Sequence, residues 1–159
     1  MKSRASAVQQ EIKQSRPFAN REQEAIVALL RTTDVLRRHL SSVVDPHGIT
    51  LQQYNVLRIL RGAGGALPTM EIGERMIEEA PGVTRMLDRL EKKNLVKRTR
   101  QSTDRRQVQC AITKEGLRLV EALDAPVNDA DLAALAGLSP EQLDGFIRSL
   151  DAVRAACAA

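Results

Sequence analysis

The segment Arg85–Arg106, RMLDRLEKKNLVKRTRQSTDRR, is the most informative part of the chain about its fold. It contains nine basic and three acidic residues, an excess of six positive charges, whereas the whole chain carries only +4. Such a local excess is typical of proteins whose partner is a polyanion, because each neutralised phosphate releases condensed counterions. The simpler alternative is a solvated basic face without a partner. A helix followed by a hairpin in the same stretch favours the first interpretation.

The first half of this stretch is predicted to be the end of a short helix. We expect this helix to open at Ala80-Pro81, because proline is preorganised for the first helical position. Asn94 should end it, since asparagine tolerates the left-handed conformation of a helix cap. Its apolar residues share one face and should be buried: Val83, Leu87 and Leu90.

The second half is predicted to form a two-stranded hairpin. Leu95–Thr99 has the character of a strand, and Val108–Ile112 alternates apolar and polar residues, as a strand with one buried face does. The residues between them, 100–106, would form a polar tip. A helix followed by such a hairpin predicts a winged helix-turn-helix, a mainly α fold with a small β-hairpin wing.

Two short helices should precede the basic one. Thr50 and Gln53 have the spacing of a capping box, which predicts a helix from 51 to about 60. Thr69 is expected to cap a second helix over 70–77. The residues expected to face the core from these helices are Tyr54, Leu57, Leu60, Ile72 and Met76.

Apolar stripes also follow two outer helices, predicted over 22–44 and 140–157, and a small winged domain cannot bury both. A symmetric partner can, so we expect a homodimer. Thr113 should cap a further helix, which Pro126 kinks or interrupts. The residues expected to form the dimer interface are Ile26, Leu29, Leu143, Phe146, Ile147 and Leu150.

The 159 residues are therefore expected to form a single domain, 1–159, with three parts. The predicted divisions are a winged lobe at 50–113, a connecting helix at 114–125, and a helical dimerisation lobe made of 22–45 and 126–157. Residues 1–20 are polar and are interpreted as a mobile arm or a short ordered extension.

Composition disfavours several other classes of protein. Two cysteines are too few for a disulfide framework or a four-ligand zinc site, and we expect no metal, cofactor or catalytic residue. An aromatic content of 2% is too low for a platform that stacks single-stranded bases. The chain has neither a membrane-spanning stretch nor a signal-peptide core, so a cytoplasmic location is expected.

The face of the basic helix opposite its apolar residues should carry Pro81, Thr84, Arg85 and Asp88. In a helix-turn-helix this face lies in the major groove, where Arg85 could form two hydrogen bonds with a guanine and Thr84 could contact a phosphate or a thymine methyl. The alternative is that Arg85 only pairs with Asp88 on the helix surface. The helix-turn-helix context favours contact with bases.

The hairpin tip, Asp104-Arg105-Arg106, suits a probe of the minor groove. A narrow minor groove has an enhanced negative potential that attracts an inserted arginine. Asp104 could hold the guanidinium of Arg106 in place. The alternative is an ordinary charged turn in which aspartate supplies the turn geometry.

Four segments together resemble the MarR family of transcriptional regulators: APGVTRMLDRLE at 80–91, LVKR at 95–98, DRR at 104–106 and ITKEG at 112–116. The resemblance implies a homodimer whose first and last helices interleave, with one winged helix-turn-helix in each protomer. It implies major-groove contacts from Thr84 and Arg85, and a wing arginine at Arg106 oriented by Asp104. Asn94 stands where the family most often has glycine.

The predicted function is a sequence-specific regulator that binds double-stranded DNA as a homodimer on a pseudo-palindromic operator, most often as a repressor. The resemblance also implies release by a small-molecule effector, and the candidate ligand residues are His39, Tyr54 and Arg58. Three alternatives stay open. They are a thiol-sensing regulator that uses Cys110 or Cys157, a non-specific architectural DNA-binding protein, and a winged domain that binds protein.

Overall fold

The computed structural model describes residues 6–78, 82–100 and 108–158. The described part is mostly helical, with a small antiparallel sheet, so the predicted fold class is confirmed. Its helices and strands are, in chain order, α1 (Ala7–Glu11), α2 (Arg21–Val44), a 3₁₀ turn (Asp45–His47), α3 (Leu51–Ala63), β1 (Leu67–Pro68), α4 (Thr69–Glu74), α5 (Val83–Lys92), β2 (Val96–Arg100), β3 (Val108–Ile112), α6 (Lys114–Leu135) and α7 (Pro140–Ala158).

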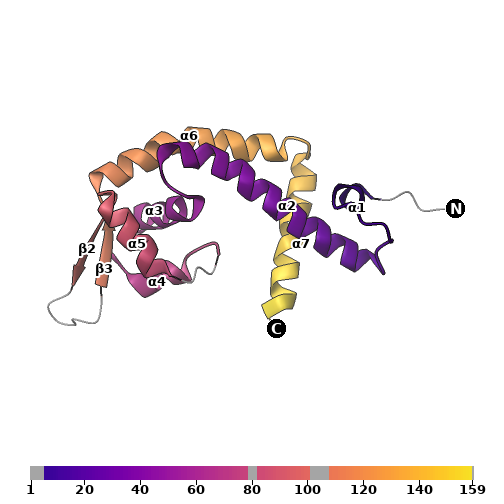
Figure 1. Ribbon diagram of the computed structural model, residues 1–159, viewed down its shortest axis with the longest axis horizontal. Helices are drawn as coiled ribbons and strands as arrows, with labels where there is room; N and C mark the ends of the chain where they lie inside the picture. Colours follow the sequence, from indigo (N-terminus) through magenta and orange to yellow (C-terminus); the bar gives the residue numbers. More distant parts are fainter. Residues whose placement is uncertain (1–5, 79–81, 101–107, 159) are drawn as a thin grey trace.

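The molecule is elongated, with the winged lobe at one end (Figure 1). Helices α3, α4 and α5 gather there beside the strands, and α6 runs from them along the top of the molecule next to α2. Helix α7 turns down from the far end of α6 and crosses α2 in this view. The outer helices are therefore far less enclosed than the helices of the lobe.

One hydrophobic core fills the space between α3, α5, α6 and the strands. Leu57, Leu87 and Leu123 have no exposed surface, and each contributes about 1.5–3 kcal/mol by burial. The apolar residues predicted to face this core do so to different degrees. Tyr54, Leu60, Ile72 and Leu90 are buried, whereas Met76 and Val83 are only partly buried at its edge.

Side-chain caps fix where several helices begin. Thr50 and Gln53 form the predicted capping box, and Thr113 accepts the N–H of Gly116 at the start of α6. The prediction for Thr69 is wrong. Its hydroxyl donates to the carbonyl of Val108, and α4 begins at Thr69 itself, so the hydroxyl ties this helix to β3 instead of capping it.

Helix α5 begins at Val83, and Gly82 before it has a φ of +100°. That left-handed conformation breaks the helical path, so the prediction that the helix opens at Ala80-Pro81 is wrong; residues 79–81 themselves lie outside the described part. At the other end, Asn94 has a φ of +57°, which confirms the predicted left-handed cap.

The sheet has three strands in the order β1-β3-β2, and both pairings are antiparallel. The predicted hairpin is present, and it pairs Val96 with Ile112 and Arg100 with Val108. Its first strand is Val96–Arg100 instead of the predicted 95–99, so Arg100 belongs to the strand and not to the tip. Strand β1 was not predicted. It consists of Leu67 and Pro68 alone, too short to show an alternating pattern, and it forms only because β3 offers a free edge.

Pro126 was predicted to kink or interrupt the helix, and interruption is wrong, because α6 continues from Lys114 to Leu135 with Pro126 inside it. Proline removes one helical hydrogen bond, and the carbonyl four residues earlier belongs to Ala122, which is exposed and therefore accessible to water. At the N-terminus, α1 shows that part of residues 1–20 is an ordered extension. Glu11 forms an ion pair of 3.3 Å with Arg31 of α2.

Candidate nucleic-acid interface

Helix α5 has one fully buried face and one open face. Leu87 and Leu90 are completely buried, whereas Thr84 and Arg85 in its first turn are exposed. The Arg85 guanidinium lies over Gly82, so that a side chain at Gly82 would begin about 3.5 Å from it. Among the described residues Arg85 forms no ion pair, and Asp88 is bonded elsewhere. The suggested pairing of Arg85 with Asp88 is therefore not present.

Asp88 belongs to a cluster centred on Arg98 of β2. The guanidinium of Arg98 lies 2.5 Å from Asp88 and 2.9 Å from Glu91, and its backbone N–H donates to Glu91 over 3.0 Å. The backbone and side-chain hydrogen bonds from Arg98 lower the pKa of Glu91 below its usual value. We name this cluster, Asp88, Glu91 and Arg98, the helix–wing clamp, because it fixes the first strand of the wing to α5.

The clamp changes the interpretation of the basic stretch. Arg98 is one of its nine basic residues, yet two carboxylates neutralise it and only 22% of its side chain is exposed. Sequence reasoning missed this role, although two acids three residues apart on the last turns of a helix, followed by a basic strand, are a usable signal. Of the nine basic residues in this stretch, those that are both described and exposed are Arg85, Arg89, Lys92, Lys93, Lys97 and Arg100.

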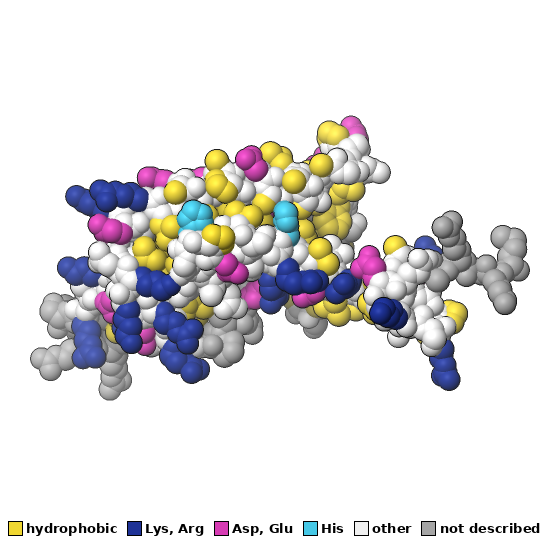
Figure 2. Space-filling view, turned by 45° about the horizontal axis from the view of Figure 1, so that its top comes forward, with side chains coloured by type: hydrophobic (Ala, Val, Ile, Leu, Met, Phe, Trp, Pro, Cys, Tyr) yellow, Lys and Arg dark blue, Asp and Glu magenta, His cyan; other side chains and the backbone are white. Residues whose placement is uncertain are grey.

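These cations extend the charged surface from α5 toward α3. Arg89, Lys92 and Lys93 border a shallow groove that also includes Gly48, and the Lys93 ammonium donates to the Gly48 carbonyl. Figure 2 shows lysine and arginine side chains gathered at the end of the molecule that carries the winged lobe. A phosphate backbone lying across this end would meet several cations at once.

The structure describes two of the six predicted DNA-binding residues. Pro81 and the wing tip, Asp104-Arg105-Arg106, lie outside the described residues. Strands β2 and β3 pair as far as Arg100 and Val108, the residues on either side of the undescribed tip. Thr84 and Arg85 are thus the two predicted contact residues whose exposure on α5 the structure records.

The predicted dimerisation residues lie on two helices with little cover. Ile26 of α2 is 49% exposed, and Phe146 and Ile147 of α7 are 37% and 49% exposed. Leu29, Leu143 and Leu150 are half-buried. Helix α7 has 19 residues and contains no buried one. These side chains form open apolar faces in the single chain.

The three candidate ligand residues have different surroundings. Tyr54 is buried, which raises its pKa, and its ring lies 5.9 Å from the Arg58 guanidinium. His39 lies on α2, where its Nε2 is 3.4 Å from the Ala130 carbonyl oxygen of α6. Tyr54 and Arg58 therefore contact each other, whereas His39 contacts α6.

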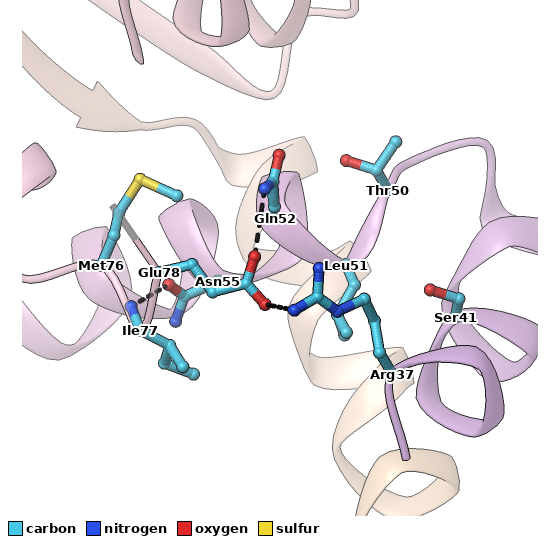
Figure 3. Close-up of a pocket in the computed structure, with 9 residues that line it drawn as sticks. All are labelled: Arg37, Ser41, Thr50, Leu51, Gln52, Asn55, Met76, Ile77 and Glu78. Atoms are coloured by element: carbon cyan, nitrogen blue, oxygen red, sulfur yellow. Dashed lines mark hydrogen bonds and ion pairs between the residues drawn. The ribbon is translucent and has the colours of Figure 1, made fainter. Parts of the chain in front are cut away.

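A cavity of about 260 Å³ lies instead between α2, α3 and the residues that follow α4 (Figure 3). Its polar lining includes Arg37, Gln52, Asn55 and Glu78, none of which was a sequence candidate. These residues come from three separate segments of the chain. Their association is a product of tertiary packing and leaves no local motif.

The two cysteines differ in their surroundings. Cys110 in β3 is completely buried, and burial raises the pKa of its thiol to about 11. A thiol of that pKa is almost entirely protonated at neutral pH, whereas the reactive form is the thiolate. Cys157 is exposed near the end of α7, and both thiols are free.

The described part of the chain shows no cluster of three or more histidine, cysteine, aspartate or glutamate side chains arranged to hold a metal ion. None of the helices described there has the length and hydrophobicity that crossing a membrane requires. The features that stand out are the exposed first turn of α5, the basic surface around it and the open apolar faces of α2 and α7.

Comparison with known proteins agrees with this geometry. A sequence profile described as the MarR family matches residues 49–108, almost the whole winged lobe. The crystal structure of the MarR transcription factor from Planctomyces limnophilus is 34% identical to the chain, with a TM-score of 0.67, and the match covers 85% of this chain and 98% of that one. The chain belongs to the MarR family of winged helix-turn-helix transcriptional regulators.

Two further relatives are similar to this MarR-family protein over different shares of its length. The transcriptional repressor MdtR of Bacillus subtilis is 42% identical over 73 residues, which is 46% of each chain, so the alignment spans about half the length of that repressor. A mutant of MarR from E. coli, solved in complex with operator DNA, shares the fold with a TM-score of 0.73, covering 94% of this chain and 99% of that one at 23% identity.

Proposed function

We propose that this MarR-family protein is a sequence-specific regulator that binds double-stranded DNA as a homodimer and acts as a repressor. The observation that carries the proposal is the first turn of α5. Thr84 and Arg85 project from it, while Leu87 and Leu90 anchor the opposite face in the core. A helix held in this way can enter the major groove without losing its own packing.

In this proposal Arg85 forms two hydrogen bonds with a guanine, and Thr84 contacts a phosphate or a thymine methyl. Arg106 enters the adjacent minor groove, oriented by Asp104, while Arg105 and Pro81 contact the DNA beside these two sites. The helix–wing clamp supports the arrangement, because it holds α5 and β2 as one unit. The major-groove and minor-groove contacts would therefore keep a constant spacing.

The homodimer is supported by the open apolar faces of α2 and α7. Packing Phe146 and Ile147 of one protomer against a second copy would remove apolar surface from water at about 25 cal/mol per Å². In the proposed division, 22–45 and 126–157 form the dimerisation lobe and 50–113 the DNA-binding lobe. A two-fold dimer presents two copies of α5, which matches a pseudo-palindromic operator.

Repression and its relief by a small ligand are the finer part of the proposal. The relatives include proteins named as repressors, among them the homoprotocatechuate degradative operon repressor of Escherichia coli, which is 25% identical over 125 residues. The cavity beside α3 gives a small molecule a place to bind near the segment that leads to α5. A redox mechanism through Cys110 is disfavoured by the burial of its thiol.

The test is selection of preferred duplexes from random sequence with the purified protein. We expect one pseudo-palindrome whose half-sites are spaced by about one helical turn, roughly 10 base pairs. Preference for that site over random DNA should persist as salt is raised. Equal affinity for all duplexes would indicate an architectural DNA-binding protein. No duplex binding would instead support a winged domain that binds protein.

A further inference from the structure

Helix α6 links the winged lobe to the outer helices, and its two halves contact different parts of the chain (Figure 1). In the first half, Asp124 bonds to Arg61 of α3. In the second half, the Ala130 carbonyl oxygen lies 3.4 Å from Nε2 of His39 on α2. Pro126 lies between these two contacts, so it separates the half of α6 that is bound to the winged lobe from the half that is bound to α2.

The start of α6 is fixed to the turn that follows the proposed recognition helix, α5. Its cap, Thr113, donates its hydroxyl to the Asn94 carbonyl over 2.7 Å and its N–H to the Leu95 carbonyl over 3.1 Å. A side chain at Gly116 would collide with the same Leu95 carbonyl, so the two backbones approach as closely as glycine permits. The first turns of α6 therefore form one body with α5 and the base of the wing.

Arg61 and Asp124 hold the middle of α6 against α3. The two terminal nitrogens of the Arg61 guanidinium donate to the two carboxylate oxygens of Asp124 over 2.7 and 2.8 Å. These hydrogen bonds lower the pKa of Asp124 below its usual value. A bidentate pair restricts the orientation of its partners as well as their distance. We name this pair the α3–α6 brace, and it holds α6 to a point just before Pro126.

Just beyond the brace, Pro126 makes α6 easy to bend. Proline has no backbone N–H, so the Ala122 carbonyl receives no helical hydrogen bond from it, and the proline ring presses against that carbonyl. Sharp bends in long helices are found at such positions. Ala122 is exposed, so water can bond its carbonyl whether the helix is straight or bent. A change of angle at Pro126 therefore costs little free energy.

The other connection between the winged lobe and the outer helices is not a continuous helix. Residues 45–48 form a 3₁₀ turn that ends at Gly48, whose φ of +75° interrupts the helical path from α2 to α3. Helix α6, by contrast, is continuous from Lys114 to Leu135. The angle of α6 at Pro126 is therefore the helical link that sets the position of the winged lobe relative to the outer helices.

We propose that Pro126 is a hinge in α6, that the α3–α6 brace limits its range, and that together they determine which half-site spacings the homodimer accepts. In a dimer the outer helices of the two protomers hold each other, so bending at Pro126 changes the separation of the two α5 helices. One additional base pair moves a half-site by about 3.4 Å and rotates it by about 35°. A dimer with a bendable α6 follows part of this change, whereas a rigid dimer loses contacts. The role in spacing rests on the proposed function, whereas the hinge itself does not.

The first experiment measures the hinge in the protein alone, by hydrogen exchange and mass spectrometry. Pro126→Ala restores the N–H that bonds the Ala122 carbonyl. The amides of residues 127–130 should then exchange about 2–12-fold more slowly than in wild type, which is the effect of one net hydrogen bond. The amides of residues 117–121 should exchange equally in both proteins. Unchanged exchange at 127–130 would overturn the hinge.

The second experiment compares affinity for the selected duplex with affinity for duplexes that have one base pair added or removed between the half-sites. The ratio of the two affinities is the spacing penalty. Pro126→Ala should raise this penalty by about 2–12-fold, because α6 bends less easily. Arg61→Gln should lower it by about 1.4–5-fold, because the brace is gone. A ratio cancels the general loss of affinity that follows from removing a positive charge.

Pro140→Ala and Arg38→Gln are the matched controls. Pro140 is the first residue of α7, where proline removes no helical hydrogen bond. Arg38 carries the same charge as Arg61, but it pairs with Asp34 on its own helix, α2. Both variants should keep the wild-type spacing penalty, and Pro140→Ala should keep the wild-type exchange at 127–130.

Opposite changes of the spacing penalty in Pro126→Ala and Arg61→Gln support the proposal. Equal penalties in Pro126→Ala and wild type would overturn the role of the hinge in spacing. An unchanged or higher penalty in Arg61→Gln would overturn the role of the brace. If wild type binds no duplex, the proposed function fails, and the hydrogen exchange still decides whether α6 has a hinge at Pro126.

Discussion

Helices α5 and α7 use their apolar residues in opposite ways. In α5, Leu87 and Leu90 are completely buried and the exposed face carries threonine and arginine. In α7, no residue is buried, and Phe146 and Ile147 keep 37% and 49% of their surface exposed. The apolar face of α5 is thus covered by other parts of the same chain, and the threonine and arginine on its opposite face are exposed to a binding partner. The outer helices leave apolar side chains exposed, and this exposure supports the proposed homodimer.

The prediction with the greatest effect concerns the exposed apolar face of α7. Replacing Phe146 and Leu150 of α7 together by aspartate should abolish the dimer and give monomer or unfolded chain, because an obligate dimer has little stability without its partner. Sedimentation velocity and circular dichroism measure both outcomes.

The matched control for that variant changes two exposed residues elsewhere on α7, Ala152→Asp and Ala155→Asp. It adds the same charge away from the apolar stripe and should leave the dimer intact. A folded and tightly dimeric Phe146→Asp, Leu150→Asp variant would show that this face of α7 is not the interface.

A smaller effect is expected from the exposed face of α5. Arg85→Ala should cost about 1–3 kcal/mol in binding to the selected duplex and relax preference at one base pair in each half-site. Binding to a set of single-base variants of that duplex measures both effects. Arg118→Ala, an equal charge change on the exposed surface of α6, should preserve discrimination between bases. Unchanged discrimination in Arg85→Ala would remove this residue from base recognition.

The wing should contribute through charge and groove width. Arg106→Ala should weaken binding most on flanks rich in A·T pairs, where the minor groove is narrow. It should also reduce the slope of log affinity against log salt by about one unit per arginine, or about two for a dimer. Asp104→Ala should act in the same direction but more weakly. Equal losses on A·T and G·C flanks, with an unchanged slope, would leave the tip as an ordinary charged turn.

The smallest effect concerns the helix–wing clamp and pH. Because Arg98 lowers the pKa of Glu91 in the folded protein, the clamp stabilises the fold above the unfolded-state pKa of glutamate, about 4.3. This stabilisation should be lost as pH falls from that value through the lower pKa of folded Glu91. Denaturant unfolding between about pH 5 and 3 should show a shallower pH dependence for Glu91→Gln than for wild type.

The matched control for the clamp is Glu115→Gln on the exposed first turn of α6. Glu115 has no ion pair within the described part of the chain, so its variant removes an equal charge without changing the clamp. Identical profiles for Glu91→Gln and wild type would show that the clamp adds no measurable stability.

Features that depend on neighbours along the chain could be predicted from the amino-acid sequence. The capping box at Thr50, the left-handed Asn94, the hairpin strands and the buried faces of Leu87 and Leu90 were all predictable. Each depends on turn chemistry, caps or periodicity within a few residues. The exposed first turn of α5 followed from the same periodicity.

Contacts between side chains that are distant in the sequence could not be predicted before the chain was folded. Arg98 could be counted as a cation, but its neutralisation by Asp88 and Glu91 required the hairpin to fold back on α5. Glu78 meets Gln52 across 26 residues and Arg37 on another helix, and the two-residue strand β1 exists because β3 lies beside it. Such contacts form where packing brings segments together, and a local pattern carries no record of them, because each residue alone has many possible partners.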